Sequence, residues 1–134
     1  MEDTVARLMR KGAITCSEDA SIRKVAQIMA VNSAHYCVVI NQQHEILGII
    51  STRSILRAFG KNLDQTTATD ILFPHTFTIT PNTPLGEAIR LMDRRKIEHL
   101  IVTLNRPGNR AVLGMLHAED IVDKMVQNQE GYHP

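Results

Sequence analysis

The sequence predicts an α/β (α+β) fold made of two βαββα repeats. An apolar spacing of i, i+3, i+4 and i+7, typical of an amphipathic helix, occurs twice at an offset of 63 positions. It is formed by Ile22, Val25, Ala26 and Met29, and again by Leu85, Ala88, Ile89 and Met92. Apolar, β-branched runs at 36–40 and 100–102 favour buried strands and nearly keep this offset. In two glycine-led stretches, 48–54 and 114–120, the glycine is expected to let the chain turn into a short buried strand, which then leads into a helix.

The elements of the first repeat follow from its residue pattern. The expected order is a helical piece at 5–9, a strand at 14–16, a helix beginning at Ser21, a hairpin of strands at 36–40 and 46–50, and a closing helix at 52–59. Gly12 follows the opening piece, where a left-handed conformation often ends a helix. Ser21 is a good N-cap. The hairpin turns through the polar residues 41–45.

The second repeat begins after a polar linker at 60–67 and follows the same order. Its expected elements are a helical piece at 68–72, strands at 77–79, 100–102 and around Gly114, the helix with the repeated spacing, and a closing helix at 118–127. A turn at Pro107 and Gly108 makes its hairpin three residues longer than the first. We expect a disordered tail at 128–134.

The predicted domains are the repeats 1–62 and 63–134, which together form one paired domain. We expect their sheets to pack against each other about a pseudo-twofold axis. Such an arrangement creates two related clefts between the repeats, and ligand sites favour interfaces of this kind.

Composition excludes several classes of function. The 134 residues include 43% apolar side chains, enough for a core, and 15 basic against 14 acidic residues give a net charge of +1. This balance makes nucleic acid an unlikely partner and gives no attraction to an anionic membrane. No apolar run is long enough to span a membrane and residues 1–4 do not resemble a signal peptide, so we expect a cytoplasmic protein. Cys16 and Cys37 lie in apolar runs and are expected to be small buried hydrophobic residues.

The sequence predicts no catalytic residues and no metal site. The six histidines show no His-x-x-x-His or Glu-x-x-His spacing on a helix. The chain also has no Gly-x-Ser-x-Gly elbow and no P-loop. A binding module is therefore favoured over an enzyme.

The glycine-led stretches supply the candidate binding residues. Ser51 lies three residues after Gly48, where a helix N-terminus favours an anion, although a serine there can simply cap the helix. Arg53 is a cation in the first turn, where it opposes the helix dipole. A bound phosphate would explain its presence there, and the alternative is a solvated surface arginine with no ligand. Asp120, beside Glu119, either accepts hydrogen bonds from a ligand or complements the dipole as a first-turn acid.

These features resemble the tandem cystathionine-β-synthase (CBS) pair, also called a Bateman module, over nearly the whole chain. The resemblance is carried by Val5-Ala6-x-Leu8-Met9, Thr78-Ile79-x-Pro81, His99-Leu100-Ile101-Val102 and the two glycine-led stretches. It implies a non-enzymatic sensor with no covalent cofactor. Its ligand would be an adenine nucleotide (AMP, ADP or ATP) or S-adenosylmethionine, bound in the clefts between repeats.

The resemblance also implies roles for single residues. The family pattern is Gly-x-x-Thr/Ser-x-x-Asp, in which the hydroxyl meets phosphate and the aspartate accepts ribose hydroxyls. The first copy keeps Ser51 but has Ser54 at the aspartate position, whereas the second keeps Asp120 but has His117 at the hydroxyl position. The usual core-strand proline is replaced by Val38 and by Ile101.

One strong site per chain is therefore expected, at Asp120. Ser51 and Arg53 from the first repeat would neutralise phosphate there, and His99 occupies a position that is often basic in the family. The resemblance adds Ala13 and Ile14 to the expected ligand contacts.

The resemblance further implies dimerisation of pairs. The closing helices carry apolar stripes, formed by Ile55, Leu56 and Phe59 and by Ile121, Val122 and Met125, that suit a homodimer. An effector protein would then respond in trans. The alternative is an interaction module whose clefts are empty and whose apolar helices serve only to dimerise.

Overall fold

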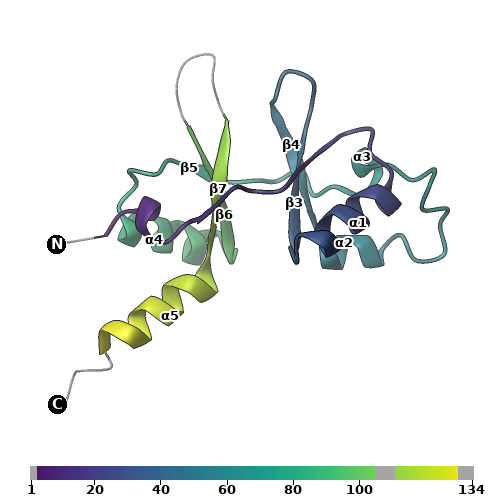
Figure 1. Cartoon of the computed structure of the whole chain (residues 1–134). Helices are drawn as coiled ribbons and strands as arrows, with labels where there is room; N and C mark the ends of the chain where they lie inside the picture. The colour runs from purple at the N-terminus through teal and green to yellow at the C-terminus, as the bar shows by residue number, and fades with distance from the viewer. Residues whose placement is uncertain (1–2, 105–110, 130–134) are drawn as a thin grey trace. The chain divides into compact units, whose positions relative to one another are not determined.

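The computed structural model describes residues 3–104 and 111–129, in which helices and strands are interleaved (Figure 1). The first half contains η1 (Val5–Arg7), β1 (Arg10–Lys11), β2 (Thr15–Ser17), α1 (Ile22–Val31), β3 (Tyr36–Ile40), β4 (Ile46–Ser51) and α2 (Thr52–Leu56). The second contains α3 (Ala68–Ile71), β5 (Thr78–Ile79), α4 (Leu85–Arg95), β6 (His99–Thr103), β7 (Val112–His117) and α5 (Ala118–Gln129). The predicted α/β class is confirmed.

Several boundaries differ from the prediction. The opening helical piece is only the 3-10 turn η1, and Gly12 has the expected left-handed conformation, with φ of 77°. Helix α2 ends at Leu56 because the following turns tighten to i→i+3 hydrogen bonds, such as Ala58 N–H to the Ile55 carbonyl at 2.9 Å. The expected turn at 107–108 and the tail from 130 lie outside the described residues.

The chain forms two compact units that are divided differently from the sequence repeats. Unit 1 comprises Met1–Gly12 and Phe77–Pro134, and unit 2 comprises Ala13–Thr76. The difference arises because each repeat contributes its opening segment to the core of the other.

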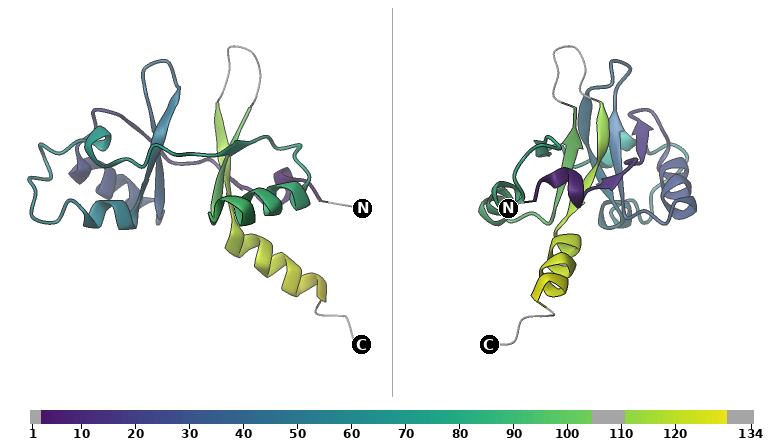
Figure 2. Two further views of the ribbon diagram at one scale, coloured as in Figure 1. Left: turned by 180° about the vertical axis from the view of Figure 1, so that it is seen from behind. Right: turned by 60° about the vertical axis from the view of Figure 1, so that its left-hand side comes forward.

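This exchange is reciprocal at the level of single hydrogen bonds. In unit 1, Val5 is fully buried in the core and its N–H donates to the Thr83 carbonyl at 2.9 Å. In unit 2, Ala68 is fully buried and its N–H donates to the Ala20 carbonyl at 2.8 Å. Both pairs are related by the 63-residue repeat offset. The N-terminal segment accordingly lies alongside α4 in unit 1 (Figure 2).

The three strands that each repeat supplies have the same order in both sheets, with β2, β3 and β4 equivalent to β5, β6 and β7. Unit 1 has the order β1-β7-β6-β5, with β5 and β6 parallel and the other pairs antiparallel. Unit 2 has β2-β3-β4, in which β2 and β3 are parallel. Beside β4, a single bridge between Ile49 and Phe73 takes the place that β1 has beside β7. The prediction did not include this fourth position in either sheet.

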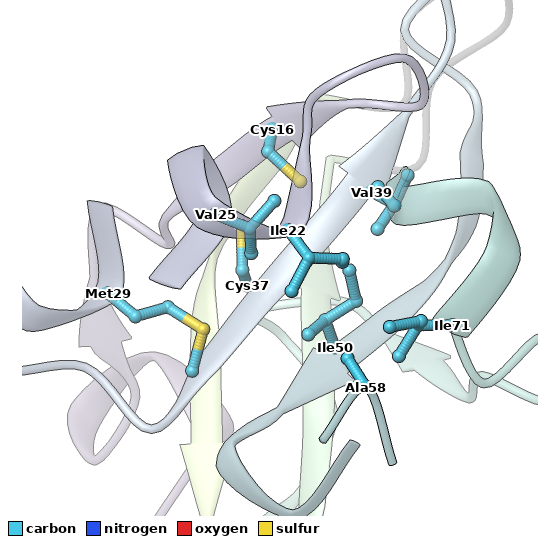
Figure 3. Packing of buried hydrophobic residues seen from close by; sticks show 10 residues of the cluster. Cys16, Ile22, Val25, Met29, Cys37, Val39, Ile50, Ala58 and Ile71 are labelled. Carbon is cyan, nitrogen blue, oxygen red and sulfur yellow. The ribbon is translucent and has the colours of Figure 1, made fainter. Parts of the chain in front are cut away.

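Helices cover one face of each sheet and enclose a separate core. In unit 2, Ile22, Val25 and Met29 of α1 pack with Cys37 and Ile50 of the sheet (Figure 3). The core of unit 1 is built from equivalent positions of α4, β6 and β7, together with Val5 and Ile121. Cys16 and Cys37 are both buried in the unit 2 core, as predicted.

Candidate functional site

The two glycines lie within strands, where another segment crosses them closely. Gly48 lies inside β4, and a Cβ placed on it would come within 2.6 Å of the Phe73 carbonyl oxygen. Gly114 lies inside β7, and its Cβ would overlap the Arg10 carbonyl oxygen. The expectation that these glycines turn the chain into the strand is therefore wrong. They leave room for the exchanged backbone instead.

In unit 2, Ser51 is the N-cap of α2, as the simpler interpretation predicts. Its Oγ accepts from the Ser54 N–H at 3.1 Å, and the Ser54 Oγ accepts from the Ser51 N–H at 3.2 Å. The two hydroxyls are also 3.0 Å apart. Ser54 is buried, so its hydroxyl serves this reciprocal capping box. A residue held in this way is poorly placed to replace a ribose-binding aspartate.

The remaining unit 2 candidates have ordinary surroundings. Arg53 is exposed, and α2 has only five residues, so its first and last turns overlap. The argument that Arg53 opposes a helix dipole therefore loses its basis. Ile14 packs partly buried against the core, and its carbonyl accepts from Val38 N–H at 2.8 Å. Ala13 is half-buried at the start of this unit.

In unit 1, the structure brings His99, His117 and Asp120 together. His99 of β6 lies directly opposite His117 of β7 in the antiparallel register, and both are half-buried. Burial lowers the pKa of His99, and the neighbouring His117 lowers it further. Both effects disfavour the charged imidazolium form of His99, which weakens the expectation that it acts as a basic ligand contact.

Asp120 lies in the first turn of α5, which follows β7 without a break. The N–H of Ala118 donates to the Glu98 carbonyl at 2.8 Å and fixes the start of the helix beside β6. This placement leaves the Asp120 side chain 23% exposed, so it is accessible from solvent while partly shielded.

Both oxygens of Asp120 are bound by Arg10, which the sequence analysis did not identify. Arg10 Nε donates to Oδ2 at 2.8 Å and Nη2 donates to Oδ1 at 3.0 Å, so the contact is bidentate. The same Nη2 donates to Glu119 Oε1 at 2.9 Å. The hydrogen bond from Arg10 holds the pKa of Asp120 below its usual value, assisted by the charges of Arg10 and His117.

The corresponding place in unit 2 has no such ion pair. Arg10 bridges to Met115 exactly where Phe73 bridges to Ile49, and Asp120 corresponds to Ser54. A charged pair in unit 1 is thus replaced by Phe73 and the buried Ser54 in unit 2. The predicted asymmetry between the two copies extends beyond the aspartate itself.

Arg10 was missed because its partner is 110 residues away in the sequence. The adjacent acids Glu119 and Asp120 indicate that a cation is nearby, but 15 basic residues are candidates. Only the pairing of β1 with β7 selects Arg10.

The described part of the chain shows neither a metal cluster nor a membrane span. Across residues 3–104 and 111–129, no three His, Cys, Asp or Glu side chains are grouped so as to hold a metal ion. None of the helices in those ranges is long and apolar enough to cross a membrane.

Two α/β units, each with a glycine in the strand that leads to its closing helix, define a tandem-repeat domain. The chain belongs to the CBS domain family, whose model matches residues 5–61 and 68–127. The resemblance seen in the sequence is therefore confirmed.

The fold is that of a CBS pair. The crystal structure of the CBS domain pair of protein MJ0100, in complex with 5′-methylthioadenosine and S-adenosyl-L-methionine, matches with a TM-score of 0.80 and 21% identity. The match covers 96% of this chain and 99% of that one.

Two sequence relatives are longer proteins. The chain is 32% identical over 125 residues to a homoserine O-acetyltransferase from Methanosalsum zhilinae, covering 93% of this chain and 24% of that protein. It is 26% identical to the uncharacterized protein MK0525 from Methanopyrus kandleri, covering 89% of this chain and 61% of that protein. The chain thus spans about a quarter and about three fifths of these relatives.

Proposed function

We propose that this chain is a regulatory module that binds an adenosyl ligand, with Asp120 as the acceptor for the ribose hydroxyls. The observation that carries the proposal is the position of Asp120: it keeps the family's aspartate position, in the first turn of α5, with its carboxylate 23% exposed. The first copy of the motif, in unit 2, offers only the buried hydroxyl of Ser54. One strong site per chain is the expected stoichiometry.

The other expected ligand contacts remain part of this proposal. His117 and His99 lie beside Asp120 on neighbouring strands of unit 1. Ser51, Arg53, Ala13 and Ile14 would contribute from unit 2, with Arg53 as the phosphate contact. The pseudo-twofold packing of the repeats, which would create the cleft, is likewise a proposal.

Charge near Asp120 favours S-adenosylmethionine over ATP. The ion cluster contains two carboxylates, Glu119 and Asp120, but only one guanidinium, that of Arg10. Burial and the neighbouring His117 lower the pKa of His99, which disfavours its charged form. The charge of His117 offsets part of the negative charge at Asp120, but the ion cluster itself suits a sulfonium cation better than a triphosphate.

Isothermal titration with AMP, ATP and S-adenosylmethionine tests the proposal. Asp120→Ala should weaken the ligand that binds by about ten- to a hundredfold, because a hydrogen bond to a charged group contributes about 1.5–3 kcal/mol. Asp123→Ala, an exposed acid on the same helix, is the matched control and should leave the affinity unchanged. If none of the three ligands binds wild type below about millimolar concentration, the sensor function is refuted.

Arg53→Ala separates phosphate recognition from a structural role. If Arg53 contacts phosphate, the variant should weaken AMP and ATP but not S-adenosylmethionine, which carries no phosphate. Equal losses for all three ligands would assign Arg53 a structural role.

The second candidate function is a homodimerisation or protein-interaction module with empty clefts. Exposed apolar side chains on the closing helices favour this function. Ile55 and Ile121 turn into the cores, but Leu56, Phe59, Val122 and Met125 remain 69%, 94%, 53% and 57% exposed. Figure 1 shows α5 extending away from the sheet of its own unit. We propose that a second copy covers these side chains.

Light scattering tests this dimer at micromolar concentration. Wild type should have the mass of two chains, and Phe59→Asp should shift it toward one chain, because a buried charge would weaken the interface. Arg57→Asp, at an exposed position two residues earlier, is the control for the added charge. A wild-type monomer would count against dimerisation.

The cytoplasmic location and an effector protein in trans stay predictions.

A further inference from the structure

Arg10 and a ribose diol would use the same edge of Asp120. The guanidinium donates two parallel hydrogen bonds, one to each carboxylate oxygen, at 2.8 and 3.0 Å. The 2′- and 3′-hydroxyls of ribose also form a pair of neighbouring donors that suits both oxygens of one carboxylate. Two bidentate donors cannot occupy one edge together.

The position of Arg10 makes this contact specific. Arg10 lies in β1, and its backbone pairs with Met115 of β7. The close approach of β1 to β7 requires a glycine at position 114. Glu119 accepts a third hydrogen bond from the same guanidinium, at 2.9 Å. Arg10 is therefore held at Asp120 by both its backbone and a second acid.

We propose that Arg10 is a competitive latch on Asp120, which a ribose-containing ligand must displace from the carboxylate in order to bind. This inference rests on the proposed function, because it takes Asp120 as the ribose acceptor. Arg10 thereby sets the affinity of the site, and the charge that it neutralises becomes available again when the ligand enters. Unit 2 has Phe73 and Ser54 at the corresponding positions and contains no such latch.

The effect of the latch should be modest and measurable. The side chains of Arg10, Glu119 and Asp120 are 54%, 68% and 23% exposed, so water and salt screen the ion pair. Removing it should tighten ligand binding by about two- to fivefold, the upper part of the range for exposed ion pairs.

Arg10→Met tests the latch with two uncharged nucleosides. Adenosine has the diol and 2′,3′-dideoxyadenosine lacks it, and ligand-observed NMR measures both affinities into the millimolar range. Adenosine should bind Arg10→Met about two- to fivefold tighter than wild type, whereas dideoxyadenosine should show no gain. Arg23→Met is the matched control, because it removes a similar exposed ion pair, Arg23 to Asp64 at 2.6 Å, from unit 2. It should change neither affinity.

A second measurement uses wild type alone and stays decisive if Arg10→Met fails to fold. Raising the NaCl concentration from about 0.01 to about 1 M shortens the Debye length from about 30 to about 3 Å and weakens the exposed latch. Adenosine binding to wild type should then strengthen relative to dideoxyadenosine binding. An unchanged ratio would contradict the latch.

The outcomes separate this inference from the proposed function. If adenosine binds wild type and Arg10→Met equally well, or the variant more weakly, the latch is overturned while adenosyl binding stands. An equal gain for both nucleosides also overturns it, because Arg10 would then act on something other than the diol. If no variant binds adenosine, AMP or S-adenosylmethionine, the proposed function fails and the latch fails with it.

Discussion

The reciprocal exchange of opening segments predicts that Val5, near the N-terminus, is essential to the stability of unit 1. Its side chain is fully buried in a core whose other buried residues all follow it by more than 80 positions. Val5→Ala removes two methyl groups, each contributing about 0.8 kcal/mol of transfer free energy, and leaves a cavity that adds to the loss. We expect the free energy of unfolding to fall by about 2–3 kcal/mol and the Tm by about 8–12 °C.

Val31→Ala is the matched control, because it makes the same chemical change at a side chain that is 85% exposed. Val31 lies at the end of α1, where alanine is a slightly better helix former, so its stability should change by less than about 0.5 kcal/mol. Urea unfolding followed by circular dichroism measures both variants. If the two variants differ by less than about 0.5 kcal/mol, the segment is not part of the core and the exchange is refuted.

Three further predictions follow from single contacts. Gly114→Ala should destabilise the protein by about 1–3 kcal/mol, because the new Cβ would push β1 away from β7. It should also speed the amide exchange of Gly12, whose N–H donates to the Leu113 carbonyl at 3.0 Å. An unchanged exchange rate would contradict this. Because burial lowers the pKa of His99, its stabilising contribution is complete above the unfolded pKa of about 6.5 and is lost as the pH falls below that value toward the folded pKa. His99→Asn should reduce this pH dependence of unfolding, and an identical profile would refute the assignment. The hydrogen bond with Cys16 and burial raise the pKa of Cys37, so this fully buried thiol should not react with Ellman's reagent until urea unfolds the protein.

The repeat organisation could be predicted because it is written in local patterns. The helical spacing that begins at Ile22 and at Leu85 predicts the buried faces of α1 and α4 except at Ile89, which is 39% exposed, and the two helices begin at Ile22 and Leu85. The continuous apolar run at 36–40 forms β3 with the predicted bounds. Hydrophobic periodicity acts over a few residues, so it can be recognised without knowing the fold.

Contacts between segments that are distant in the sequence could not be predicted in the same way. The sequence shows that Gly48 and Gly114 are equivalent, but not that they make room for Phe73 and Arg10. From the sequence, Ser54 is predicted to be a weak ribose acceptor, whereas the structure shows it buried in a capping box with Ser51. These contacts depend on which backbones lie side by side, which local patterns do not encode.

The sequence by itself determined that this protein is a tandem CBS repeat in which only the second copy keeps the aspartate. The tertiary structure decided which side chains surround that aspartate, and it placed Arg10 on both of its oxygens. The physical reason is that each repeat covers its core with the opening segment of the other. That exchange brings position 10 to position 120, and so decides the electrostatics of the site.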